Sequence, residues 1–261
     1  MQRRVDVGTV ISKAFSLYGA QAGTLLPVAF ALFLIVGVLQ GVLTGPLILI
    51  GTLASLVAGT LYQGMVVRLV EDVQDGRRDW SAGELLKSVT PVIVPLILAG
   101  ILVGLMFVVG IILLIVPGLL VLTFFAVTGP AIVVERLGVI EGLKRSRELV
   151  KGHAWQVFGV VIVAFLIVFV VNLIFGVIAG VAGNDVVVRI VATVVASTIT
   201  APISALVGAV LYFALRGTDP TPGVGPAMGT VGAPGGETVP GASTPPPPPP
   251  PPAGGPQSPA R

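Results

Sequence analysis

The sequence predicts an all-α integral membrane protein with about six transmembrane helices, short cytoplasmic interfacial helices and a disordered, proline-rich C-terminal tail. Three observations lead to this fold class. The 261 residues are 54% hydrophobic and only 10% charged, whereas soluble domains carry about 25% charged residues. Six long apolar runs follow one another along the chain. Fifteen of the 22 prolines lie after residue 216, where long apolar runs are lacking.

Each apolar run is long enough to cross a bilayer, for which about 20 residues are needed. The runs cover residues 22–44, 47–68, 92–115, 118–135, 155–182 and 187–215. The connections Gly45-Pro46 and Pro117-Gly118 carry no charge and are short, so we expect hairpin turns there. The first run is too long for the apolar core of a signal peptide and starts too far into the chain. We therefore expect it to remain as a span.

The basic residues indicate the topology, because Lys and Arg favour the cytoplasmic side of a membrane. Fourteen of the 15 fall on one side of the six-span arrangement, and only Arg189 falls on the other. We therefore expect a plasma-membrane protein with both termini in the cytoplasm. The predicted cytoplasmic residues are Arg3, Arg4, Lys13, Arg68, Arg77, Arg78, Lys87, Arg136, Lys144, Arg145, Arg147, Lys151, Arg216 and Arg261.

Three cytoplasmic segments, 7–18, 82–89 and 140–151, have apolar residues at helical spacing. Ser81 and Glu84 fit a capping box at the start of the second segment. Amphipathic helices beside a membrane lie in its interface, with the apolar face down and basic residues toward the headgroups. Each segment leads into an odd-numbered span, which suggests a unit of interfacial helix plus hairpin used three times. The alternative is that such helices are ordinary features of cytoplasmic loops.

A pattern of about thirty residues follows the fourth run. It comprises Gly129-Pro-Ala-Ile-Val-Val-Glu135, Gly138, Gly142-Leu-Lys-Arg-Ser-Arg-Glu-Leu-Val-Lys-Gly152, Trp155 and Gly159. Together with Ile11-Ser-Lys-Ala-Phe-Ser-Leu-Tyr18, it resembles uncharacterised bacterial multi-pass proteins related to the membrane domain attached to some glycerophosphoryl diester phosphodiesterases. The resemblance covers residues 1–216 and implies a polytopic α-helical fold. It does not imply hydrolysis, because the catalytic barrel of those enzymes is a separate soluble domain.

Several kinds of chemistry are excluded by composition. The chain has no cysteine and a single histidine, His153, which rules out thiolate chemistry and multi-histidine metal sites. The segment from Asp72 through Asp75-Gly76 begins the signature of membrane enzymes that transfer CDP-linked alcohols. The second pair of aspartates in that signature is missing here, since residues 91–134 contain no acid. We therefore predict no catalytic residue, no metal site and no cofactor.

Two groups of residues are candidates for binding. Guanidinium and ammonium groups suit phosphate oxygens, so one candidate is a contact with anionic lipid headgroups by Arg136, Lys144, Arg145, Arg147 and Lys151. The alternative is that these residues mark topology and pair with Glu135, Glu141 or Glu148. The other candidate is an intramembrane polar lining formed by Gln40, Gln63, Asn172, Ser197, Thr198 and Ser204.

The polar lining competes with a packing interpretation. Glycines four residues apart, as in Gly37/Gly41, Gly100/Gly104 and Gly176/Gly180, let transmembrane helices approach closely, and hydroxyls bond across helices. Proton-driven transporters usually keep an ionisable residue at mid-membrane, and the apolar runs contain none there. Packing is therefore favoured over a substrate path. Asp185 and Arg189, four residues apart at the outer surface, are expected to form an exposed pair.

Residues 1–216 are therefore predicted to form the membrane domain, and residues 217–261 the disordered tail. The run Pro245 to Pro252 favours a polyproline II rod that either docks on a protein partner or acts as a spacer. The leading function is a non-enzymatic membrane scaffold or accessory protein that works through lipid or protein contacts at its cytoplasmic face. The alternatives are a transporter or channel for an uncharged or lipidic substrate and, third, a lipid-metabolism enzyme. We expect no nucleic-acid partner.

Overall fold

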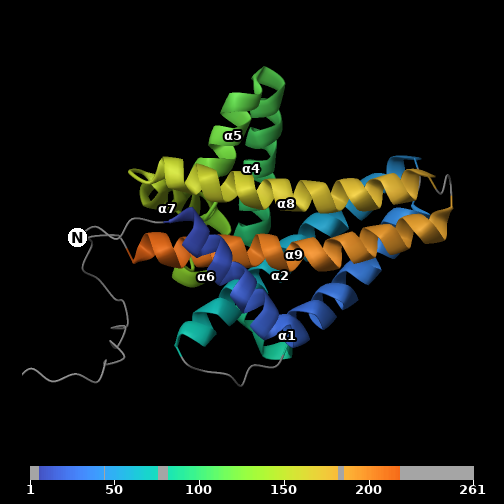
Figure 1. The fold of residues 1–261 in the computed structure, drawn as a ribbon, viewed down its shortest axis with the longest axis horizontal. Helices are drawn as coiled ribbons and strands as arrows, with labels where there is room; N and C mark the ends of the chain where they lie inside the picture. The colour runs from blue at the N-terminus through green and yellow to red at the C-terminus, as the bar shows by residue number, and fades with distance from the viewer. Residues whose placement is uncertain (1–5, 44, 76–81, 182–184, 218–261) are drawn as a thin grey trace, which may run out of the picture. The chain divides into compact units, whose positions relative to one another are not determined.

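The computed structural model describes residues 6–43, 45–75, 82–181 and 185–217. The predicted disorder of the tail beyond Gly217, and the capping role of Ser81, lie outside these residues. Within them the secondary structure is helical and contains no strand. Figure 1 shows the helices, with α9 crossing α1 and running beside α8. The predicted all-α fold is confirmed.

Six segments of the described residues are long and apolar enough to cross a membrane. They correspond to the six predicted runs, with the fourth built from two short helices. The helices of these segments are α1 (Val7–Val42), α2 (Ile48–Gln74), α4 (Ile93–Leu113), α5 (Ile115–Phe124) with α6 (Thr128–Glu135), α8 (Ala154–Val181) and α9 (Val186–Arg216).

The first predicted interfacial segment is not a separate helix. It forms the opening turns of α1, whose 36 residues would be roughly 54 Å long if straight. The Asp6 carboxylate caps this helix by accepting from the backbone N–H of Thr9 at 2.8 Å. Figure 1 shows that α1 bends along its length, and Pro27 lies within the helix. A proline inside a helix lacks the amide donor and produces such bends.

The other two interfacial segments are separate helices, α3 (Ala82–Val89) and α7 (Val139–Val150). A short 3₁₀ turn, Thr90–Val92, links α3 to α4 and contains Pro91. A turn at Gly152, whose φ is +95°, links α7 to α8. A backbone in this left-handed region is costly for any residue with a Cβ, so glycine allows the direction to change there.

Helix α9 lies at the centre of the core. It packs on α1, α2 and α8, and most of its second half is buried. The contact with α1 is close at Gly37, where an added Cβ would lie 2.5 Å from Val194 Cγ2. Gly41 meets Ile190 in the same way. These two glycines let the backbones of α1 and α9 approach, as the packing interpretation of this pair requires.

One of the two predicted hairpin turns falls at a slightly different place. Gly45, with φ +60°, lies between α1 and α2 as predicted. The second turn lies at Leu114, which has an extended backbone between α4 and α5, rather than at Pro117-Gly118. Gly118 instead packs against α4, since a Cβ added at Gly110 would lie 2.8 Å from Gly118 Cα.

The fourth span is interrupted, whereas the sequence predicts one continuous helix. Helix α5 ends at Phe124 and α6 begins at Thr128. The intervening residues form a turn in which the Thr128 N–H donates to the Phe125 carbonyl at 3.2 Å. In lipid, a broken helix is tolerated only where protein or water satisfies the freed backbone groups. The interruption therefore needs polar neighbours from other elements.

Candidate functional site

The apolar face of α7 packs on protein. Leu143, Leu149 and Val150 are buried, and α7 contacts α4, α5, α6 and α9. Gly142 lies against Ile132 of α6 so closely that an added Cβ would clash with that side chain. The amphipathic pattern predicts instead that this face lies on the membrane. The structure differs because the neighbouring helices supply a better-packed apolar surface.

A charged cluster fixes α7 to the ends of α6 and α9. The Arg145 Nε lies 3.0 Å from both carboxylate oxygens of Glu135, the last residue of α6. The Tyr212 hydroxyl of α9 donates to Glu135 Oε1 at 2.7 Å. Arg145 also lies 4.0 Å from Glu148. Within the described ranges, Arg145 is the member of the predicted lipid contact that makes the ion pairs of the alternative interpretation.

Two further hydrogen bonds join neighbouring helices, one between α7 and α5 and the other between α2 and α6. The buried Ser146 hydroxyl donates to the Phe124 carbonyl at 2.9 Å, at the end of α5. Arg68 of α2 donates to the Val133 carbonyl of α6 and pairs with Glu71 at 2.7 Å. Serine and arginine here satisfy carbonyls near helix ends, which have no partner within their own helix.

The opposite face of α7 carries a row of basic residues. Lys144, Arg147 and Lys151 are exposed, and their spacing of three and four residues places them on one side of the helix. Two exposed apolar residues flank these cations in the sequence: Ile140 of α7 with 53% exposure, and Trp155 of α8, beyond the turn at Gly152, with 82%. We call these five residues the basic row. It combines cationic groups with an exposed tryptophan, a residue enriched at membrane interfaces.

Arg136, the remaining member of the predicted contact, is exposed and caps the end of α6. Its φ of 52° is left-handed, a conformation otherwise found in the described residues at Gly45 and Gly152. Such a residue reverses the chain after a helix. Arg136 therefore places α7 beside α6 and presents its own side chain at the same end of the molecule.

The six residues of the predicted polar lining lie on four helices, and no hydrogen bond in the described chain joins any two of them. Gln40 donates to the Gly51 carbonyl across the α1–α2 hairpin at 3.4 Å. Asn172 is exposed on α8 and donates to the Val168 carbonyl of its own helix. Ser197, Thr198 and Ser204 lie on α9, where Ser204 bonds to the Thr200 carbonyl.

Gln63 differs from these residues because it lies next to the interruption of the fourth span. A Cβ added at Gly129 would lie 3.0 Å from Gln63 Oε1. Gln63 thus brings a carboxamide to the first turn of α6. Among the described residues no hydrogen-bond partner of this carboxamide is found.

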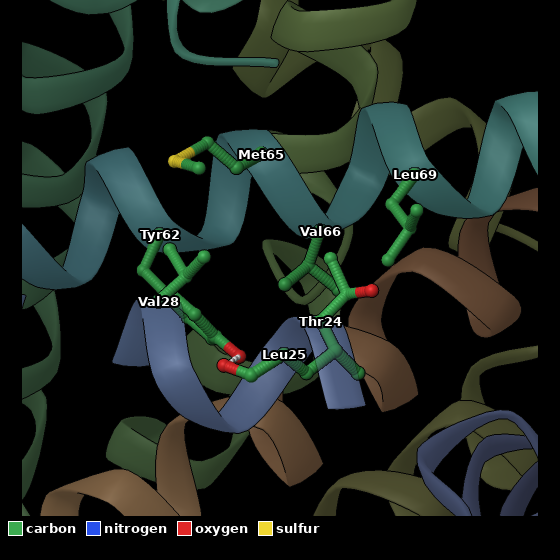
Figure 2. A pocket seen from close by; sticks show the side chains of 7 residues that line it. All are labelled: Thr24, Leu25, Val28, Tyr62, Met65, Val66 and Leu69. Atoms are coloured by element: carbon green, nitrogen blue, oxygen red, sulfur yellow. Dashed lines mark hydrogen bonds between the residues drawn. The ribbon is translucent and has the colours of Figure 1, made fainter. Parts of the chain in front are cut away.

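A small pocket lies between α1 and α2 (Figure 2). The Tyr62 hydroxyl points across it and donates to the Leu25 carbonyl at 3.1 Å. The volume of the pocket is about 10 Å³, enough for a single water molecule. The lining is mostly apolar and consists of Thr24, Leu25, Val28, Tyr62, Met65, Val66 and Leu69. This pocket has no room for a drug-sized substrate.

Acidic residues of the described chain do not gather into a group of three that could hold a metal. Asp72 is buried near the end of α2, while Asp75 caps the helix and is exposed. Asp185 caps α9 through the amides of Val187 and Val188. The expected pairing of Asp185 with Arg189 is wrong, because Arg189 instead donates to the Gly41 carbonyl at 3.0 Å, near the negative end of α1.

Sequence reasoning did not identify Tyr212, Ser146 and Arg68 as members of this site. Each acts on a carboxylate or carbonyl that is distant in the sequence, and spacing along one helix does not reveal such partners. The only usable signal was a polar or charged residue at a helix end inside an apolar context. That signal marks Arg68 and Tyr212 as boundary residues without indicating what they contact.

Comparisons with known proteins place this arrangement in a family. The sequence matches the model described as a domain of unknown function, DUF7847, over residues 14–215. A UPF0259 membrane protein from Pectobacterium carotovorum subsp. carotovorum (strain PC1) is 32% identical over 103 residues, which are 40% of this chain and 41% of that protein. The chain thus spans about two fifths of the length of this curated relative. No solved structure matches the chain. Six apolar helices, a membrane-protein relative and a family match over most of the sequence lead to one conclusion: this chain is a multi-helix bacterial membrane protein that belongs to the DUF7847 family.

Proposed function

We propose that the protein is a non-enzymatic membrane scaffold or accessory protein that binds anionic lipid headgroups through the basic row of α7. The observation that carries the proposal is that one face of α7 packs on protein while the other face exposes basic residues. Arg145 is engaged by Glu135, and Leu143, Ser146 and Val150 face the core. The helix is therefore held in one orientation, with its remaining cations directed outward.

The electrostatic gain is large enough to matter. Each Lys or Arg near an anionic leaflet contributes roughly 1 kcal/mol, so Lys144, Arg147 and Lys151 together would contribute roughly 3 kcal/mol. Trp155 and Ile140 at the ends of the row would enter the headgroup region, as interfacial aromatic and aliphatic residues do. Arg136 adds a further exposed cation at the same end of the molecule.

The proposal requires α7 to lie at the cytoplasmic leaflet of the plasma membrane. The charge asymmetry supports this orientation, because α7 follows the fourth span and contains three of the 15 basic residues. A fourth, Lys151, follows immediately. With both termini in the cytoplasm, Arg189 is the single cation left outside. Its bond to the end of α1 offers a structural reason for that exception.

Two related proposals remain with this function. The first is a non-hydrolytic role beside lipid-handling enzymes, which rests on the sequence resemblance of residues 129–159 alone, since the matched family and relative carry no such link. The polyproline run of the tail supports recruitment of a protein with an aromatic groove. Transport of an uncharged substrate is the second candidate function, and the position of Gln63 at the interrupted fourth span is the observation that favours it.

The lipid proposal is tested with the triple variant K144Q/R147Q/K151Q in nanodiscs of phosphatidylcholine with and without phosphatidylglycerol. The wild-type protein should unfold at a higher temperature in the anionic discs, and the variant should lose this difference. High salt should also reduce it, because salt screens exposed charges. Mass spectrometry of lipid that copurifies in mild detergent provides the second measurement.

The matched control is K13Q/K87Q, which removes exposed cations from α1 and α3. It should keep most of the anionic stabilisation. Equal losses in the two variants would indicate attraction to the whole basic surface and would contradict a site on α7. If the triple variant kept the full stabilisation by anionic lipid, the basic residues would serve only to set the topology.

A further inference from the structure

The interruption between α5 and α6 leaves polar groups of three elements close together. A broken helix exposes carbonyls at the end of its first half and N–H groups at the start of its second half. The Ser146 hydroxyl bonds the Phe124 carbonyl, and the Thr128 N–H bonds the Phe125 carbonyl. These bonds account for part of the freed backbone. The Ala126 carbonyl is not bonded to any described residue.

A small space adjoins that carbonyl. Gly208 of α9 is buried, yet an added Cβ would find no atom nearer than 3.7 Å. The atoms around this position are Gln63 Nε2 at 3.7 Å, Pro130 Cγ at 3.9 Å and the Ala126 carbonyl oxygen at 4.0 Å. A Cβ-sized space therefore has both an amide donor and a carbonyl acceptor among its nearest atoms.

A second observation comes from Thr128, two residues after Ala126 at the start of α6. The Thr128 side chain is only 3% exposed, and its hydroxyl oxygen has no hydrogen-bond partner among the described residues. Thr128 precedes Gly129, where an added Cβ would lie 3.0 Å from Gln63 Oε1. A buried hydroxyl without a partner is costly, and in native proteins such groups are usually satisfied by ordered water.

We infer that the interrupted fourth span contains a binding site for a neutral hydrogen-bonding molecule, and that water occupies it. The water would accept from the Gln63 amide, donate to the Ala126 carbonyl and bond to the Thr128 hydroxyl. Buried waters typically make about three such bonds to otherwise unsatisfied groups. The groups around the site are an amide, a carbonyl and a hydroxyl, so they suit a neutral ligand rather than an ion.

The site gives the interruption a physical explanation. A water molecule that links α2 to the gap between α5 and α6 replaces the helical bonds that the fourth span lacks, in the way that other membrane proteins stabilise broken helices. It would also distinguish Gln63 from Asn172. Asn172 faces outward and satisfies its amide on its own helix.

Water-edited solid-state NMR on ¹⁵N-labelled protein in bilayers tests the inference. Magnetisation should pass from water to the Gln63 side-chain nitrogen faster than to that of Asn172, the dry internal reference. Gly208→Ala places a methyl group in the space and should abolish the fast transfer. Gly59→Ala is the matched control, because nothing lies within 4 Å of an added Cβ at Gly59, and it should leave the transfer unchanged. Equal transfer to Gln63 and Asn172 in the wild-type protein would overturn the inference.

The sign of a stability change provides an independent measurement. If water bridges these groups, Gln63→Met leaves the carbonyl and the hydroxyl without their link, and the melting temperature should fall. If the space is dry, Gln63→Met removes an unsatisfied amide, and the melting temperature should rise. A rise would contradict the bound water.

Discussion

Arg145 holds Glu135 through its Nε, which lies 3.0 Å from both carboxylate oxygens of that residue. The pair joins the middle of α7 to the last residue of α6, and the Tyr212 hydroxyl completes the cluster from α9. Both charged side chains are partly shielded, with 24% and 20% exposure. Three helices thus meet at one carboxylate, and the orientation of α7 depends on it.

Arg145→Met should therefore lower stability in neutral detergent, whereas Lys144→Met should change it little. Removing Arg145 leaves Glu135 partly buried without its ion pair, while the tyrosine bond remains. After allowance for solvent screening, we expect a loss of about 1–2 kcal/mol. Thermal unfolding monitored by tryptophan fluorescence measures the change. Equal melting temperatures for the two variants would show that the cluster does not stabilise α7.

Gly41→Ala should destabilise the protein more than Gly176→Ala. At Gly41 an added Cβ meets Ile190 of α9, whereas at Gly176 no described atom lies within 4 Å. Overpacking of a close contact costs about 1–3 kcal/mol, and alanine in an open helical position gains helix propensity. The melting temperatures of the two variants in the same detergent measure this difference. A lower value for Gly176→Ala would indicate that this exposed glycine face contacts another molecule.

The N-terminal cap of α1 should depend on pH. Two groups of Thr9 donate to the Asp6 carboxylate and hold its pKa below the usual value of 3.8. The backbone N–H has the larger effect and the hydroxyl the smaller one. A depressed pKa stabilises the folded helix start above the unfolded pKa, and this stabilisation is lost as pH falls through the folded pKa. After correction for intrinsic exchange, the Thr9 amide should lose hydrogen-exchange protection below about pH 4.

Asp6→Asn is the control for that measurement, because asparagine also caps helices but does not titrate. In this variant the corrected protection of the first turn should no longer change with pH. A pH dependence that persists in Asp6→Asn would assign the effect to another group.

Reporter fusions should establish the orientation. Fusions after residues 45, 117 and 184 are expected outside the cytoplasm, and those after residues 76, 142 and 220 inside it. The reason is that Lys and Arg near short loops resist translocation. A cytoplasmic signal from the fusion after residue 117 would leave the six-span arrangement without a consistent charge distribution.

Removal of residues 218–261 should leave the membrane domain inserted and folded. A membrane bundle depends on helix packing and satisfied backbone bonds, and the removed residues contain no apolar period that could contribute to either. Membrane fractionation and thermal aggregation of the truncated and full-length proteins compare the two. Early melting of the truncated protein would show that the tail packs on the helices.

Much of the architecture could be predicted from the residues because a bilayer imposes strict requirements. A run of about 20 apolar residues must cross the membrane as a helix, so the positions of α4, α8 and α9 follow within a few residues. Helices α1 and α2 include their predicted runs but extend beyond them, α1 at its start and α2 at its end. Charge asymmetry predicts an orientation, and the periodicity of residues 140–151 predicts α7. In each case the relevant property is local in the sequence.

The tertiary structure decided which surfaces meet. Gly37 and Gly41 pack against α9, whereas Gly176 and Gly180 have the same spacing and meet no described atom. Five basic residues looked equivalent in the sequence, but Arg145 alone is bound to Glu135. The fourth run predicts one helix, but the structure has a break within it. Ser146 bonds the Phe124 carbonyl at this break, and Gln63 lies beside it. Spacing along a helix identifies a face, while its partner lies on another helix far away in the chain, so only the packed structure reveals the contact.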